Sequence, residues 1–104
     1  MMVLLERHVQ QIRLDKWAEL EALDKKFNAV ESRHGFPTKR RYRCYVGGHN
    51  ISTLIVERQW GSLATMEVAY EKAFADPEYQ ALEAESAAII ESVQIELYEP
   101  LPEG

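Results

Sequence analysis

The order in which two hydrophobic periodicities follow each other is the strongest constraint on this chain. Residues 3–10 carry apolar side chains at alternate positions, which is the two-residue period of a strand. The next apolar residues recur every three or four positions, as on one face of a helix: Trp17, Leu20, Leu23, Phe27 and Val30. We expect Asp15 to cap this helix, and Gly35 and Pro37 to end it.

The middle of the chain repeats this pattern with a hairpin inserted. Two strand-like runs, residues 40–46 and 51–60, flank a Gly-Gly-His-Asn sequence at 47–50, which is typical of a turn between antiparallel strands. Ser62 then caps a second predicted helix. The Asp-Pro pair at 76–77 restarts a helix, because aspartate accepts from first-turn amides and proline is tolerated there.

The predicted elements follow the order β-α-β-β-α-β, closed by a last strand at residues 93–98. That order predicts an α+β, ferredoxin-like fold, in which a four-stranded antiparallel sheet carries its helices on one face. A length of 104 residues suits one domain, and we assign residues 1–104 to a single domain. The helices cover only one side of the sheet, so the other face is a candidate for function.

Strand parity assigns side chains to these two faces, because alternate residues point in opposite directions. We expect the helices to cover the more apolar set, which comprises Leu5, Val9, Tyr42, Cys44, Val46, Leu54, Val56, Val93, Ile95 and Leu97. The open face then carries Leu4, Glu6, His8, Gln10, Arg41, Arg43, Tyr45, Thr53, Ile55, Glu57, Gln94, Glu96 and Tyr98. This mixture of charged, aromatic and apolar side chains fits a face that meets a second copy and encloses a partly polar pocket.

Two groups on that face are candidates for chemistry. His8 and Glu6 share one side of a strand and can form an acid/base pair, since imidazole titrates near neutral pH. The alternative is a histidine that is only hydrogen-bonded at a dimer seam. Arg41 and Arg43 can bind a carboxylate or phenolate through charge-assisted hydrogen bonds, or can instead pair with acids of the same sheet.

The remaining ligand-binding candidates are the aromatic and acidic residues of the predicted open face. Tyr45 and Tyr98 can stack on an aromatic ligand, or can simply pack against their neighbours. Glu57 and Glu96 complete the candidate set as polar partners for the arginines. Cys44, the only cysteine, is expected to point at the helices as an unreactive core thiol.

Several classes of protein are disfavoured by composition. A formal net charge of −5 argues against nucleic-acid binding, and no apolar run reaches the roughly 20 residues of a membrane helix. The N-terminus meets a charge too early for a signal peptide, and a single cysteine forms no intrachain disulfide. We therefore expect a cytoplasmic protein without membrane partners. The cysteine and histidine spacing predicts no metal site, and we expect no cofactor.

Residues 55–101 resemble the NIPSNAP family of the dimeric α/β-barrel superfamily, which also contains the antibiotic-biosynthesis monooxygenases. The resemblance rests on Ile-Val-Glu-Arg-Gln-Trp at 55–60, Ser-Leu at 62–63, Asp-Pro-Glu-Tyr at 76–79 and the apolar strand at 93–97. It implies a homodimer whose sheets pack face to face into a barrel with a central pocket. Related haem-degrading members carry a haem-ligating histidine on the second helical stretch, whereas this chain has no histidine after His49.

Two function classes remain open at this point. The chain is either a NIPSNAP-like homodimeric barrel that binds a small organic ligand in a pocket of the open face, or a cofactor-independent, monooxygenase-like enzyme. In the second case His8 and Glu6 would move a proton, while Arg43 and Tyr45 would position the substrate. The residues alone do not demand catalysis.

Overall fold

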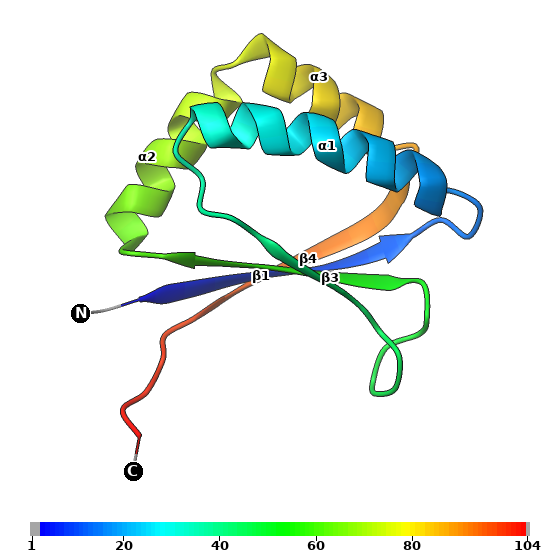
Figure 1. The fold of residues 1–104 in the computed structure, drawn as a ribbon, viewed down its shortest axis with the longest axis horizontal. Coiled ribbons are helices and arrows are strands. Elements are labelled where there is room, and N and C mark those ends of the chain that lie inside the picture. The colour runs from blue at the N-terminus through cyan, green and yellow to red at the C-terminus, as the bar shows by residue number, and fades with distance from the viewer. Residues whose placement is uncertain (1–2, 104) are drawn as a thin grey trace.

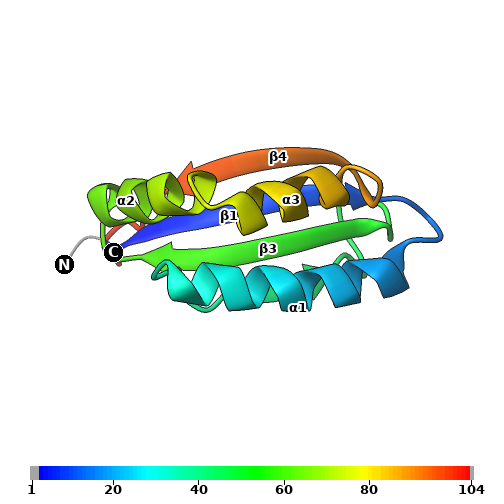
Figure 2. The same ribbon diagram turned by 90° about the horizontal axis from the view of Figure 1, so that it is seen from above.

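A computed structural model of the chain describes residues 3–103. It has two layers, with the helices on one face of a four-stranded sheet and the other face open (Figure 1). The predicted ferredoxin-like order is confirmed. Seen from the helix side, α1 covers one half of the sheet, α2 and α3 lie over the other half, and β4 forms an outer edge (Figure 2).

The four strands are antiparallel and lie in the order β2-β3-β1-β4. They span Leu4–Ile12 for β1, Arg40–Arg43 for β2, Thr53–Trp60 for β3 and Ile90–Tyr98 for β4. The central strands β1 and β3 pair over most of their length, with Leu4 opposite Trp60. β2 is shorter than the predicted 40–46, because the hairpin connection takes up residues 44–52.

The helices begin and end close to the expected positions. They span Trp17–Arg33 for α1, Leu63–Phe74 for α2 and Pro77–Ser86 for α3. Ser62 accepts a hydrogen bond from the amide of Thr65, and Asp76 accepts one from the amide of Glu78, so both predicted caps are confirmed. The predicted cap at Asp15 is wrong. Lys16 occupies the N-cap position of α1, and no side chain caps this end.

The core lies between the helices and the sheet. Trp60, Leu23 and Val30 are among its fully buried side chains, and Tyr79 and Leu82 add the inner face of α3. At the end of α1 the chain turns through Gly35, whose φ of 81° is a conformation that favours glycine. That turn brings Phe36 back into the core.

The predicted faces are confirmed for β3 and β4 but are wrong for β1 and β2. Glu6 and His8 point towards the helices, because the register pairs Glu6 with Arg58 and Leu97, and His8 with Val56 and Ile95. The apolar residues of the opposite parity in β1, including Val9, lie on the open face. The core donors described below make the inward position of the Glu6 carboxylate tolerable.

In β2 the two faces are exchanged for a different reason, because α1 presents the carboxylates of Glu21 and Asp24 to this strand. Arg41 donates to Glu21 at 2.9 and 3.1 Å, which turns its side chain towards that helix. Arg43 stacks on the ring of Trp17, 4.5 Å from its centroid. Tyr42 consequently lies on the open face, beside Ile55.

Residues 44–52 form a hairpin connection that extends beyond the sheet on its open side (Figure 1). Cys44 is half-buried there, and its thiol donates to the carbonyl of His49 at 3.1 Å. The expectation that Cys44 points at the helices is therefore wrong. Tyr45 is 93% exposed and Val46 is also exposed, so neither packs against the sheet. Within residues 3–103, no helix is long and apolar enough to cross a bilayer.

Candidate functional site

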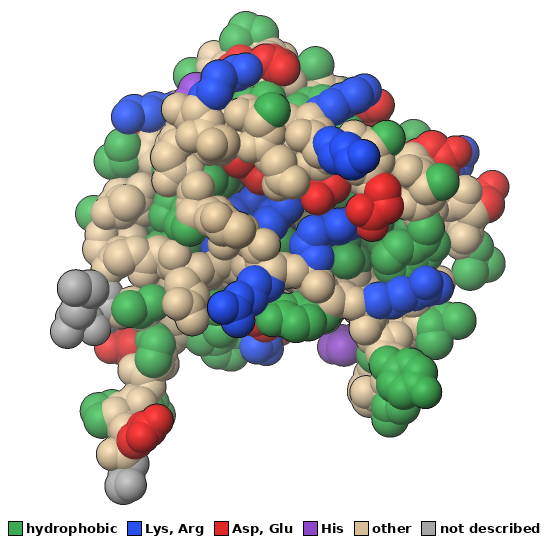
Figure 3. Space-filling view, in the orientation of Figure 1, with side chains coloured by type: hydrophobic (Ala, Val, Ile, Leu, Met, Phe, Trp, Pro, Cys, Tyr) green, Lys and Arg blue, Asp and Glu red, His purple; other side chains and the backbone are tan. Residues whose placement is uncertain are grey.

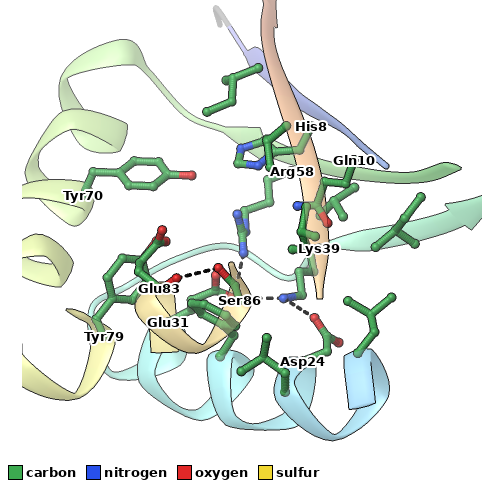
Figure 4. A pocket seen from close by; sticks show the side chains of 18 of the residues that line it. His8, Gln10, Asp24, Glu31, Lys39, Arg58, Tyr70, Tyr79, Glu83 and Ser86 are labelled. Carbon is green, nitrogen blue, oxygen red and sulfur yellow. Dashed lines mark hydrogen bonds and ion pairs between the residues drawn. The ribbon is translucent and has the colours of Figure 1, made fainter. Parts of the chain in front are cut away.

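A cavity of about 270 Å³ lies between the helices and the inner face of β1, β3 and β4. Figure 4 shows it from close by, with His8, Gln10 and Arg58 on the sheet side and Tyr70, Tyr79 and Glu83 on the helix side. Phe74, Val93 and Ile95 line the cavity and are also exposed, so its mouth lies between the helices and the edge strand β4. The candidate site is therefore inside one chain, not on the open face.

The walls of the cavity are mostly apolar. On the helix side, four aromatic rings form a continuous row in which neighbouring centroids are 5.6 to 5.8 Å apart: Phe27, Tyr79, Phe74 and Tyr70. On the sheet side the aliphatic part of the wall consists of Leu54 and Val56 from β3 and of Val93 and Ile95 from β4. Such walls favour an organic ligand with an apolar body.

At one end of the cavity, Glu6 is the centre of a buried hydrogen-bond network. Its carboxylate accepts from the indole of Trp60 at 2.9 Å, from the hydroxyl of Tyr70 and from Nε2 of His8 at 2.8 Å. The guanidinium of Arg58 lies 3.8 Å away. Only 3% of Glu6 is exposed, so these contacts replace water as the partners of its charge.

These contacts determine the protonation state of Glu6. Burial by itself raises the pKa of the carboxyl, because the charged form loses its hydration. Hydrogen bonds from His8, Tyr70 and Trp60, together with the charge of His8, outweigh burial and lower the pKa from 4.5 to about 2. Glu6 is therefore ionised at neutral pH. Burial and the neighbouring charge of Glu6 raise the pKa of Tyr70, which keeps its hydroxyl a donor.

The ionised carboxylate also determines the tautomer of His8. An ionised carboxylate only accepts hydrogen bonds, so Nε2 of His8 must carry the proton that is donated to Glu6. In the neutral imidazole Nδ1 is then the basic nitrogen. The His8 side chain lines the cavity and is only 16% exposed. The pair thus has the arrangement of a general base held in orientation by a carboxylate.

Arg58 crosses from β3 towards α1 beside this pair. Its Nη2 lies 2.6 Å from the carboxylate of Glu31, and the guanidinium stacks over Phe36 at 5.1 Å. The side chain is 4% exposed. Its Nε is buried and has no hydrogen-bond partner within residues 3–103. The Nε–H of Arg58 therefore has no acceptor among residues 3–103.

Further ion pairs continue from Glu31 to the surface along α1. Nζ of Lys39 lies 3.2 Å from Glu31 and 2.6 Å from Asp24, and Asp24 is 3.5 Å from Nε of Arg41. Arg41 ends the series at Glu21. Figure 3 shows basic and acidic side chains side by side on the face of the molecule below α1. The cations at this end of the cavity are therefore already paired.

The predicted site residues lie in four separate places. His8 and Glu6 are hydrogen-bonded at the cavity, whereas Arg41 and Arg43 lie outside it against α1. On the open face, Glu57 accepts a hydrogen bond from Arg7 at 2.8 Å, and the guanidinium of Arg7 stacks on the ring of Tyr98. Arg7, Glu57 and Glu96 line a shallow hollow of this face. Tyr45 lies alone on the hairpin connection.

The cavity residues absent from the sequence prediction include Arg58, Tyr70, Glu31 and Lys39. Arg58 had a usable signal, because it shares the parity of Leu54 and Val56 in a strand whose inner face was predicted correctly. The other three come from α2, α1 and the segment before β2. Their convergence depends on the packing of the helices, which periodicity does not specify.

Comparison with known proteins identifies the fold. No protein-family model matches the chain, and no curated protein matches its sequence. Among solved structures, a NIPSNAP family protein from Agrobacterium tumefaciens is 21% identical, with a TM-score of 0.81 over 95% of this chain and 86% of that chain. A NIPSNAP-like domain protein from Burkholderia xenovorans is 12% identical, with a TM-score of 0.81 over 95% and 85% of the two chains.

A third similar structure has a described activity. SnoaB from Streptomyces nogalater, a cofactor-independent oxygenase, is 16% identical, with a TM-score of 0.69 over 97% of this chain and 98% of that chain. These likenesses show that the chain has the fold of NIPSNAP proteins and of this oxygenase. At sequence identities of 12 to 21% these likenesses show the fold alone. Any activity has to be argued from the residues of the cavity.

The lowered pKa of Glu6 predicts a specific loss of stability in acid. A carboxyl with a depressed pKa stabilises the folded state above its unfolded value, here 4.5, and loses that contribution as the pH falls towards 2. The loss amounts to about 3 kcal/mol. Denaturant unfolding from pH 7 to pH 2 should show the free-energy difference between the wild type and Glu6→Gln shrinking by this amount.

The matched control is Glu19→Gln, an exposed carboxylate in the first turn of α1. Its difference from the wild type should stay nearly constant over the same pH range. A Glu6→Gln curve that runs parallel to that of the wild type would show that the buried network does not hold the charge of Glu6.

Proposed function

From this NIPSNAP fold, we propose that the chain binds a small organic ligand in the cavity between the helices and the sheet. The observation that carries the proposal is the cavity itself, which combines aromatic and aliphatic walls with the His8–Glu6 pair at one end. Its volume of about 270 Å³ lies just below the usual range for ligand pockets, which begins at roughly 300 Å³. A compact ligand, such as one with a single ring, suits this space.

Blocking the mouth of the cavity should abolish binding. Ile95 is 61% exposed and lines the cavity from the edge strand, so Ile95→Trp adds bulk at the entrance without overpacking the core. With acetophenone as the probe, saturation-transfer NMR should detect binding to the wild type and at least a tenfold weaker affinity for the variant. The tenfold criterion corresponds to about 1.4 kcal/mol.

Val68→Trp is the matched control. Val68 is a comparably exposed β-branched residue on α2, and it does not line the cavity. Circular dichroism verifies that both variants are folded. Equal acetophenone binding by Ile95→Trp and the wild type would place the ligand elsewhere and refute the proposal.

The His8–Glu6 pair supports a second candidate, a cofactor-independent enzyme that begins by moving a proton. Glu6 orients His8 by accepting from Nε2, which leaves Nδ1 as the base. In the proposed step a C–H bond next to a ligand carbonyl breaks, the proton passes to Nδ1, and the electron pair stays on the ligand as an enolate. SnoaB, which shares the fold, is a cofactor-independent oxygenase, and this likeness supports the candidate by analogy.

Proton exchange tests that step directly. In D₂O, the wild type should catalyse exchange of the methyl protons of acetophenone, followed by NMR. His8→Asn should lower the enzyme-dependent rate by at least about 100-fold, the usual contribution of a general base. His49→Asn, on the exposed hairpin connection, is the control. Equal rates in the wild type and His8→Asn would leave the chain as a binding protein.

The open face of the sheet supports the proposal of a homodimer. Its exposed or half-buried side chains include Tyr42, Ile55 and Tyr98, placed around the ion pair between Arg7 and Glu57. An apolar and aromatic patch with a polar centre matches the composition of many homodimer interfaces. Two sheets that pack through this face would form the barrel implied by the NIPSNAP resemblance.

One charged substitution in the centre of the open face should break this dimer. Ile55→Glu places a carboxylate beside Glu57 and leaves it unpaired in the interface. Sedimentation velocity should show a dimer for the wild type and a monomer for Ile55→Glu. Val68→Glu on α2 is the control and should remain dimeric. A wild type that sediments as a monomer at micromolar concentration would refute the dimer.

A further inference from the structure

We propose that the cavity prefers an uncharged, oxygen-bearing ligand to a carboxylate, and that Glu31 sets this preference by pairing with Arg58. The inference rests on the proposed ligand-binding function, because it concerns the same cavity. It narrows the ligand to ketones, aldehydes, alcohols or phenols in their neutral forms.

The first argument is the charge balance around the cavity. Arg58 and Lys39 are the two cationic side chains of its lining, and both are paired with carboxylates that also lie there or directly behind it. Arg58 contacts Glu31 and Glu6, while Lys39 contacts Asp24 and Glu31. Glu83 adds a further carboxylate at the mouth. The two permanent cations, Arg58 and Lys39, therefore face four carboxylates, those of Glu6, Asp24, Glu31 and Glu83.

A carboxylate ligand would enter an environment whose net charge already repels it. It would also leave water to reach a largely apolar cavity, and a buried charge is costly without a free partner of the opposite sign. The two arginines predicted for the site offer no free partner, since Arg41 is bound to Glu21 and Arg43 is stacked on Trp17. An uncharged ligand is neither repelled by the carboxylates nor required to bury a charge.

The second argument is the unused N–H of Arg58. A buried donor without a partner is costly, and Nε of Arg58 is also closed to solvent. A small shift of the Arg58 side chain would let a neutral acceptor oxygen remove that cost without adding charge. The Arg58 side chain is nearly fully buried and lines the cavity. In Figure 4 it extends across the cavity from the sheet towards Glu31, next to His8. A carbonyl or hydroxyl oxygen near Arg58 would lie in the same region as the imidazole.

Glu31 is the residue that determines this selectivity. Its carboxylate is the nearest anion to Arg58, at 2.6 Å, and the same oxygen contacts Lys39 at 3.2 Å. Replacing Glu31 with Gln removes one negative charge and leaves both cations with fewer partners. The guanidinium would then be available for a carboxylate ligand, with which arginine forms strong charge-assisted hydrogen bonds.

The test compares two probes of nearly equal shape, acetophenone and benzoate, by saturation-transfer NMR at neutral pH. The wild type should bind acetophenone at least tenfold more tightly than benzoate. In Glu31→Gln the affinity for benzoate should rise at least tenfold, with a much smaller change for acetophenone. Circular dichroism verifies folding, and the wild-type ratio tests the preference even where the variant does not fold.

Glu83→Gln is the matched control, because it removes the same charge from the mouth of the cavity without touching Arg58. An equal gain of benzoate affinity in this variant would attribute the selectivity to overall charge and overturn the role of Glu31. Benzoate binding as tight as acetophenone binding in the wild type would overturn the preference, while the cavity function would stand if Ile95→Trp still blocks both. Binding of neither probe would overturn the cavity function and this inference with it.

Discussion

The burial of one carboxylate, that of Glu6, imposes a condition that the surrounding structure has to meet. An ionised carboxylate inside a protein is very costly unless several donors converge on it. Here those donors come from three elements: Trp60 at the end of β3, Tyr70 in the middle of α2 and His8 on β1 itself. The hydrogen bond from Tyr70 to the Glu6 carboxylate therefore requires α2 to lie at this place over the sheet. In this position Tyr70 and Phe74 of α2 form part of one wall of the cavity.

A second set of buried charges holds α1 in the same way. Arg58 reaches from β3 to Glu31 on α1, and Lys39 joins Glu31 to Asp24, about two turns away along that helix. Buried ion pairs add little net stability compared with apolar packing, but a lost partner leaves an expensive unpaired charge. We infer that these pairs specify the position of α1 more than they strengthen the fold.

The sequence was sufficient for the order of the elements, but it was insufficient for the faces of two strands. In β4 the apolar residues alternate cleanly, and parity assigned Ile95 correctly. In β3 residues 54–56 are all apolar, which made parity ambiguous, but the predicted inward position of Val56 is confirmed. In β1 both parities carry apolar residues, so the choice depended on whether Glu6 had donors in the core, and these donors lie 54 and 64 positions further along the chain. In β2 the arginines turned to acids on α1, a contact between elements that no local pattern contains. The pairing of His8 with Glu6 was predictable because it is local, whereas the participation of Arg58 and Glu31 was not recognised.

Because Glu6 and His8 point to the inner face of β1, the ligand site and the dimer interface lie on opposite faces of the sheet, whereas the sequence prediction had put both on the open face. The sheet is one layer thick, so successive residues of β1 serve opposite faces: Glu6 and His8 face the cavity, while Arg7 and Val9 face the open side. A ligand site and a dimer interface can then occupy the same strand without competing for the same side chains. The proposed dimer would act on the ligand site only through the backbone of β1 and β3. The selectivity of the cavity is accordingly determined by charges within one chain, foremost the pairing of Arg58 with Glu31.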